Sequence, residues 1–259
     1  MTQSSDRKRV ALVITELEVG GAERCLANLA VGLARAQFEP FVIALAPPPT
    51  APQDALALQL EEAQIPLRFL GCGSKWHLMA AVGKLRHALK QIAPQVVQSM
   101  LFHANVVTRL ALRPVAEPLW CAGIRVADPS HTRQAIERRA LRAADRVVCV
   151  SQMVADYAAG NLKVPPGNLL VIPNGVDMAS AAGQPVPLAP LGVPSSRRAI
   201  TCVARLATQK GIDQLLLAAP HILRSLPEHD LLLVGDGPQA TELRRMAERT
   251  GLAERIHFC

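Results

Sequence analysis

Aromatic residues are scarce in this sequence. Trp76, Trp120 and Tyr157 are the only tryptophans and tyrosine, and aromatic residues make up 3% of the chain. Nucleic-acid binders usually stack bases on aromatic side chains, so this scarcity argues against nucleic acid as a partner. The core must be built from Leu, Val, Ala and Ile, which suits parallel sheets covered by helices.

Paired cysteines and long apolar runs are also missing. The six cysteines are spread singly, without a C-x-x-C pair, which indicates neither a zinc site nor a disulfide framework and favours a reducing cytoplasm. No stretch approaches the roughly 20 apolar residues that a membrane helix needs. The polar start Met1–Arg9 and the short apolar run behind it do not resemble a signal peptide. We expect a soluble cytoplasmic protein, attached at most peripherally to the inner face of a membrane.

The composition otherwise allows a proper core. Half of the 259 residues are hydrophobic, 19% are charged, and the formal net charge is +7. A basic surface attracts phosphorylated ligands, anionic membranes and nucleic acid alike, so charge alone does not choose among them.

Short apolar runs alternate with longer segments of helical period, which is the pattern of βαβ units in a parallel sheet. In the helix expected within Lys75–Ile92, apolar residues recur three or four apart. Its basic residues Lys75, Lys84, Arg86 and Lys90 form a solvated face, with contact to anionic lipid as the less favoured alternative. Strands are expected at Val10–Leu17, Phe41–Ala46, Pro66–Leu70, Val96–Met100, Leu119–Ile124 and Arg146–Val150.

A proline-rich segment interrupts this order and predicts a domain boundary. We expect an N-terminal domain at 1–178, a linker at 179–198 and a partial second domain at 199–259. The second domain shows two βα units and the beginning of a third strand, which cannot cover both faces of a parallel sheet. The sequence therefore predicts a chain truncated at its C-terminus, with on the order of 100 residues missing.

Two cations flank the first strand-to-helix turn of the second domain. Arg205 follows the strand expected at Ala199–Ala204, and Lys210 precedes the helix expected at about Gly211–Leu226. Fixed positive charges beside a helix N-terminus can clamp a diphosphate. Such loops lie at the ligand crevice of an open α/β sheet, which favours this interpretation over two solvated surface cations.

Other turns give weaker signals. Gly20 and Gly21 open a helix directly after the first strand, where glycines let a ligand approach the backbone, although a plain tight turn is equally compatible. Gly235 ends a later strand in the same way. Asn174 stands in an Asn-Gly turn beside the boundary. His103 follows the strand Val96–Met100 and could bind or deprotonate a substrate hydroxyl, whereas a histidine there is more often structural.

Together and in this order, five phrases resemble the GT-B retaining glycosyltransferases of family four, the group-1 transferases. Such enzymes have two Rossmann-like domains facing a cleft, the second of which would be incomplete here. The resemblance covers nearly the whole chain, through EVGGAE at Glu18–Glu23, ADRVVCVS at Ala144–Ser151, IPNGVD at Ile172–Asp177, VARLATQKG at Val203–Gly211 and LLVGDGP at Leu232–Pro238.

The resemblance implies an acceptor bound mainly by the first domain and a nucleotide-sugar donor bound mainly by the second. It assigns Arg205 and Lys210 to the donor diphosphate, where they stabilise the leaving group in place of a metal ion, so that neither metal nor cofactor is expected. It assigns Gly20 and Gly21 to the cleft-facing loop near the phosphates, and Gly235 to donor contacts.

His103 is the best match to the family's catalytic histidine, and Arg125 is a second cationic candidate. The donor is expected to be a UDP-sugar and the acceptor a saccharide or a lipid-linked glycan, as in polysaccharide biosynthesis. One departure stands out, because the family's pair of glutamates with seven residues between them should lie beyond Phe258. The alternative is therefore a truncated, non-catalytic remnant that binds only nucleotide or a partner.

Overall fold

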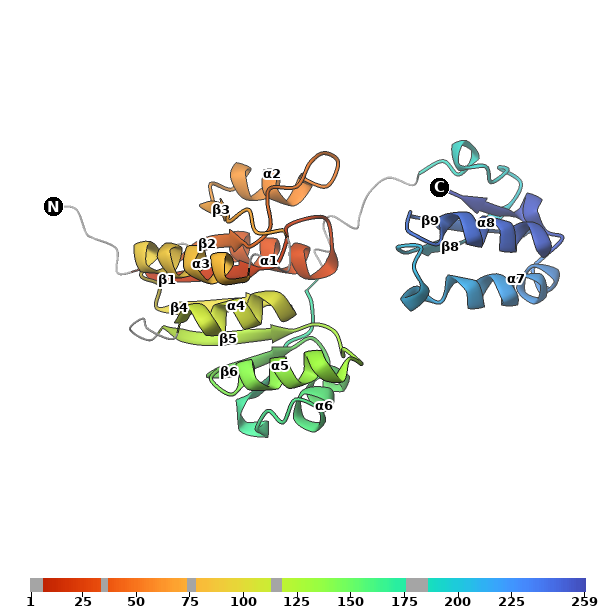
Figure 1. The fold of residues 1–259 in the computed structure, drawn as a ribbon. Coiled ribbons are helices and arrows are strands. Elements are labelled where there is room, and N and C mark those ends of the chain that lie inside the picture. The colour runs from red at the N-terminus through yellow and green to blue at the C-terminus, as the bar shows by residue number, and fades with distance from the viewer. Residues whose placement is uncertain (1–6, 34–36, 74–77, 113–117, 176–185) are drawn as a thin grey trace. The chain divides into compact units, whose positions relative to one another are not determined.

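The computed structural model describes residues 7–33, 37–73, 78–112, 118–175 and 186–259. The chain divides into two compact units between Val176 and Asp177. Figure 1 draws the first in red to green and the second in teal to blue. Residues 176–185, which include part of the linker predicted at 179–198, lie outside the described residues.

The first unit is built on a parallel sheet of seven strands in the order β3-β2-β1-β4-β5-β6-β7 (Figure 1). The chain moves outward from β1 to β3, crosses back, and continues on the other side of β1. Six strands overlap those predicted, and β7 adds an edge. The bounds are β1 Lys8–Ile14, β2 Phe38–Ala44, β3 Leu67–Phe69, β4 Val96–Met100, β5 Leu119–Ile124, β6 Arg146–Cys149 and β7 Leu169–Val171.

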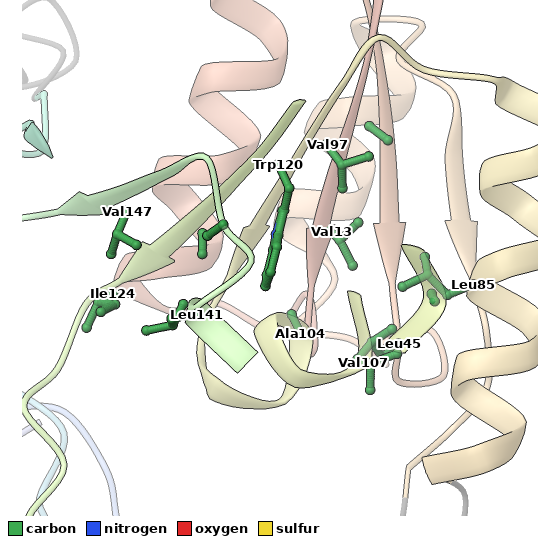
Figure 2. Packing of buried hydrophobic residues seen from close by; sticks show 14 of the residues in the cluster. Val13, Leu45, Leu85, Val97, Ala104, Val107, Trp120, Ile124, Leu141 and Val147 are labelled. Atoms are coloured by element: carbon green, nitrogen blue, oxygen red, sulfur yellow. The ribbon is translucent and has the colours of Figure 1, made fainter. Parts of the chain in front are cut away.

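Helices bury both faces of this sheet. In β1, Ala11 and Val13 face one core cluster, while Leu12 and Ile14 face the other. This period of two with both faces apolar is what a parallel sheet between helix layers requires. Figure 2 shows the first cluster, in which Trp120 is central. Helices α1 (Gly21–Gly32) and α2 (Ala55–Glu62) cover one face, and α3 (Leu78–Ile92), α4 (Phe102–Leu112), α5 (His131–Leu141) and α6 (Gln152–Gly160) the other.

The basic residues of α3 are not all solvated, which corrects the sequence interpretation. Lys84 Nζ donates to the carbonyl of Leu70 at 2.7 Å. Arg86 is half-buried and donates to the last carbonyls of α4, at Leu110 and Ala111. Lys84 thus donates to a carbonyl just after β3, and Arg86 donates to carbonyls in the last turn of α4, where helix ends leave carbonyls for donors outside the helix. Lys75 lies outside the described residues.

The second unit contains a parallel sheet in the order β10-β9-β8. Its apolar core lies between this sheet and two helices. The segment that follows the undescribed residues 176–185 packs here too, with Val193 fully buried. The first strand and helix lie close to their predicted ranges. The elements are β8 Arg198–Val203, α7 Ile212–Ser225, β9 His229–Val234, α8 Ala240–Arg249 and β10 Ile256–Phe258.

A buried carboxylate connects residues at or just before the beginnings of these strands. Asp230 of β9 is 1% exposed. His257 Nε2 lies 2.9 Å from Asp230 Oδ2, and Arg197 Nη1 and Arg255 Nε lie 3.0 and 3.5 Å from Oδ1. Burial alone would raise the pKa of Asp230, but the hydrogen bond from His257 and the charge of Arg197 outweigh it and lower the pKa. The cluster ties the edge strand β10 to the centre of the sheet.

Candidate active site

The first unit has a pocket of about 710 Å³ at the carboxyl edge of its sheet. Thr15 and Glu16, which follow β1, line it together with Leu101–His103 after β4 and Ile124–Val126 at the end of β5. The strand order reverses between β1 and β4. Open α/β sheets bind ligands outside the carboxyl ends of their strands at such a reversal, so this pocket is the ligand site that the topology predicts.

A left-handed residue brings His103 to this pocket. Leu101 connects β4 directly to α4 with φ of 76°, a conformation that non-glycine residues seldom adopt and that often marks functional sites. Its carbonyl accepts the first helical hydrogen bond, from the N–H of Asn105. His103 lies in the first turn of α4, is exposed, and makes an edge-to-face contact with Phe102 at 5.1 Å. The structure thus places the predicted histidine in the pocket wall.

Gly20 and Gly21 form the predicted strand-to-helix turn, and the turn already holds a carboxylate. Gly20 precedes the first residue of α1, Gly21. The Glu23 side chain folds back over Gly20, so that a Cβ there would overlap Glu23 Oε2. Backbone N–H groups of Ala22 and Glu23 hydrogen-bond this carboxylate, which is 8% exposed, and burial raises the pKa of Glu23. The expected anion preference of this helix start is met, within the chain itself, by Glu23.

Arg125 connects three of the segments that the sequence singled out. Its guanidinium donates to Cys25 Sγ of α1 at 3.0 Å, to Met100 Sδ at the end of β4 at 3.4 Å, and to Asn174 Oδ1 after β7. Asn174 therefore contacts a pocket residue rather than forming only a turn. Val176 and Asp177, which complete the IPNGVD phrase, lie outside the described residues.

A buried carboxyl group, which sequence reasoning missed, lines the same pocket. Glu137 of α5 is 5% exposed. Asn105 Nδ2 donates to Glu137 Oε1 at 3.4 Å and to the carbonyl of Gly123 at 3.2 Å. Ser99 Oγ donates to Asn105 Oδ1 at 2.7 Å and accepts from Trp120 Nε1 at 2.9 Å. Burial is the main cause that raises the pKa of Glu137.

In the second unit, Arg205 and Lys210 lie in the loop between β8 and α7, and both are exposed. Lys210 belongs to a short 3-10 turn, and Gly211 follows it in the left-handed region as the residue that precedes α7. Within the described part of the chain, neither cation has a hydrogen-bond, ion-pair or aromatic partner. Two unneutralised charges therefore stand beside the start of a 14-residue helix.

Gly235 has a clear structural role next to this loop. It follows β9 with φ of 141°, and a Cβ there would overlap the carbonyl oxygen of Ala204. A Cβ on Gly237 would likewise overlap the carbonyl oxygen of Leu206. The loops after β8 and β9 lie against each other through backbone hydrogen bonds, from Leu206 N to the Asp236 carbonyl and from Gln239 N to the Leu206 carbonyl. The glycines thus fix the loop that carries Arg205.

Among the described residues, no group of three His, Cys, Asp or Glu side chains is placed to hold a metal ion. None of the helices in the described ranges has both the length and the hydropathy to cross a bilayer.

Comparison with solved structures defines the class. The chain has the GT-B glycosyltransferase fold: it matches Anabaena HepE in complex with UDP-glucose with a TM-score of 0.81, 21% identity, and coverage of 98% of this chain and 69% of that one. A glycosyltransferase from Rickettsia africae gives a TM-score of 0.77 at 18% identity, covering 98% of this chain and 68% of that chain.

The sequence belongs to a named family within this class. The profile of Glycosyltransferase Family 4 matches residues 19–180, more than half of the 259, and the profile of Glycosyl transferases group 1 matches residues 188–259. The chain is therefore a member of Glycosyltransferase Family 4, as its five phrases predicted.

Curated relatives are similar over part of their length. A GDP-mannose-dependent phosphatidylinositol monomannoside mannosyltransferase from Mycolicibacterium smegmatis is 34% identical over 131 residues, 48% of this chain and 34% of that protein. A 2-deoxystreptamine N-acetyl-D-glucosaminyltransferase from Streptomyces fradiae is 29% identical over 171 residues, 61% of this chain and 41% of that protein. The matches thus span between a third and a half of these relatives.

Proposed function

We propose that this protein transfers a sugar from a UDP-sugar to a saccharide or lipid-linked glycan acceptor in the cytoplasm, and that the anomeric configuration is retained. The observation that carries the proposal is the pair of exposed cations, Arg205 and Lys210, which have no side-chain partner among the described residues and lie beside the start of α7. A helix start and two nearby cations suit the binding of a diphosphate.

Relatives support this donor class without fixing the sugar. HepE was solved with UDP-glucose, whereas the mycobacterial relative uses GDP-mannose. Acceptors among the relatives include both a phosphatidylinositol mannoside and a 2-deoxystreptamine compound. Diphosphate recognition is common to all these donors, so Arg205 and Lys210 suit any of them.

The proposed chemistry assigns each predicted residue a task. Arg205 and Lys210 hold the diphosphate and stabilise the negative charge that develops on it as the glycosidic bond breaks. His103, in the wall of the first unit's pocket, binds the acceptor hydroxyl or the sugar at the reacting centre. Gly20 and Gly21 keep their predicted place in the loop near the phosphates, although the N–H groups of that helix start hold the Glu23 carboxylate. Gly235 keeps the Arg205 loop in place while contacting the donor.

Calorimetric titration with UDP tests the donor site. We expect Arg205→Ala and Lys210→Ala each to weaken UDP binding by at least about tenfold, because a hydrogen bond to a charged group contributes about 1.5–3 kcal/mol. Arg224→Ala is the matched control, since Arg224 is exposed in the last turn of α7, at the helix end opposite Lys210.

Each result of that titration has a distinct meaning. A folded protein that gives no heat with UDP would count against the donor site. Binding without sugar transfer to any acceptor would favour the alternative, a protein that binds only nucleotide or a partner.

We further propose that donor binding needs neither metal nor cofactor, because the two cations supply the charge that a divalent ion supplies elsewhere. UDP affinity is then expected to be the same in EDTA and in excess Mg²⁺, measured by the same titration on the wild-type chain. A tenfold gain in affinity with Mg²⁺ would contradict this proposal.

A further inference from the structure

Among the described residues that line the pocket of the first unit, acidic side chains outnumber basic ones. They include three carboxyl groups and two guanidinium groups, together with His103. The whole chain has a formal charge of +7. A basic protein with an acidic ligand pocket selects among ligands by charge, because groups facing a partly desolvated cavity interact more strongly than surface groups. The five residues are Glu16, Asp128, Glu137, Arg125 and Arg133.

Both arginines are already engaged by the protein. Arg133 Nη1 forms an ion pair with Asp128 Oδ2 at 2.7 Å, and the guanidinium lies over the Phe102 ring at 4.5 Å. Arg125 donates to three segments of the first unit, as described above, and its charge faces buried Glu23. These contacts partly neutralise both guanidinium charges and so weaken their attraction for an anionic ligand.

Glu137 is the buried carboxyl group of the pocket that keeps an oxygen for a ligand. Asn105 contacts only Oε1, and in the described ranges Oε2 has no hydrogen-bond partner and no cation within ion-pair distance. The side chain is 95% buried from solvent, yet it lines the pocket. A buried carboxylate is costly unless it is paired, so a ligand that brings a positive charge to it gains most.

The rest of the pocket wall is mainly aliphatic. Leu45, Val107 and Ile124 belong to the core cluster and also line the pocket, and Figure 2 shows them among its packed side chains. Such walls suit the carbon skeleton of a ring, while the few polar groups fix its orientation. The volume of about 710 Å³ lies within the ordinary range of small-molecule sites.

We propose that the acceptor in this pocket is a polyhydroxylated ring carrying a protonated amine, and that Glu137 Oε2 accepts a hydrogen bond from the ammonium group. The inference rests on the proposed transferase function and specifies its acceptor. It makes Glu137 a residue that determines specificity, held in place by Asn105 and Ser99, and it predicts that anionic rings bind poorly.

Three six-membered carbocycles of different charge test this inference in calorimetric titrations of the UDP-saturated chain. 2-Deoxystreptamine carries two amines, myo-inositol is neutral, and myo-inositol 1-phosphate is anionic. We expect the diamine to bind at least about tenfold more tightly than myo-inositol, because a charge-assisted hydrogen bond is about twice as strong as a neutral one, and the phosphate to bind most weakly.

Glu137→Gln removes the charge but keeps the shape and an oxygen for Asn105. We expect it to lower diamine affinity to about that of myo-inositol and to leave myo-inositol affinity within about threefold. Glu16→Gln, an exposed lining position outside the buried network, should weaken diamine binding to a smaller extent and remains informative if Glu137→Gln does not fold. Glu62→Gln, exposed at the end of α2, is the control and should change nothing.

Three outcomes would overturn the inference. The first is that myo-inositol 1-phosphate binds most tightly, and the second is that 2-deoxystreptamine and myo-inositol bind with equal affinity. The third is that Glu137→Gln weakens the binding of all three rings equally, which would indicate a purely structural role. The same samples separate this inference from the donor proposal. UDP binding without the diamine preference refutes only the acceptor class, whereas absent UDP binding refutes the proposed function.

Discussion

Gly235→Ala is expected to destabilise the second unit by about 2–4 kcal/mol. The new Cβ would overlap the carbonyl oxygen of Ala204, a backbone atom that cannot rotate away. Overpacking of this kind costs about 1–3 kcal/mol, and alanine at a φ of 141° adds about 1 kcal/mol. Because the clash pushes the loop that carries Arg205, UDP affinity should fall as well. Urea denaturation with hydrogen exchange of β8 and β9 peptides measures the loss.

Gly251→Ala is the matched control for this prediction. Gly251 also has a positive φ, 70°, but a Cβ there meets no atom within 4 Å. Its substitution therefore contains only the conformational cost, about 1 kcal/mol, and should leave UDP binding intact. Equal destabilisation by the two substitutions would show that the close approach to Ala204 is unimportant.

Asp230→Ala is expected to cost about 3–5 kcal/mol in the same unit. Removing one member of a buried ionic cluster leaves the others uncompensated, and here Arg197, Arg255 and His257 all lose their shared carboxylate. The edge strand β10 should lose hydrogen-exchange protection first. Glu228→Ala, one exposed carboxylate nearby in sequence, should change stability by less than about 0.5 kcal/mol.

The same carboxylate makes the stability of the second unit depend on pH in the acidic range. The pKa of Asp230 is lowered in the folded state, so its contribution is fully present above the unfolded pKa of about 3.9 and is lost as pH falls through the folded value. At pH values below about 4, we expect the urea concentration at the unfolding midpoint to fall for the wild-type unit and to fall less for Asp230→Ala. An equal fall of the urea midpoint with falling pH in the wild type and in Asp230→Ala would contradict this assignment.

The sequence was sufficient for the elements and for the family, because both depend on local pattern. The apolar runs at Val96–Met100 and Leu119–Ile124 are strands β4 and β5 with the predicted bounds. The solvated face predicted for α3 was wrong at Arg86, since the partner carbonyls lie in α4, 24 and 25 residues away. Periodicity indicates which face of a helix is apolar, but not which loop or helix end will pass beside a polar side chain.

The candidate site was predicted in part. Strand-to-helix turns direct attention to the carboxyl edge of a sheet, and this reasoning singled out His103, which lies in the pocket wall. Arg125, which the family resemblance gave as a second cationic candidate, lies there too. Glu137 gave no such signal, because it stands in the middle of α5 among charged neighbours that resemble a solvated face. Its burial depends on Asn105, 32 residues away, and the spacing alone does not reveal that contact. The roles of Gly20, Gly21, Arg205 and Lys210 in donor binding remain predictions.

The pocket of the first unit draws its wall from residues as distant in sequence as Thr15 and Glu137. Because the wall comes from segments this far apart in the sequence, a ligand can bind in the pocket only after the sheet has assembled. A bound ring therefore shifts the folding equilibrium of the entire unit, by about 2.7 kcal/mol at a hundred times its dissociation constant. Every tryptophan and tyrosine of the sequence lies before residue 176, so the absorbance and fluorescence of these residues report on the first unit, whereas residues 177–259 contain neither residue type.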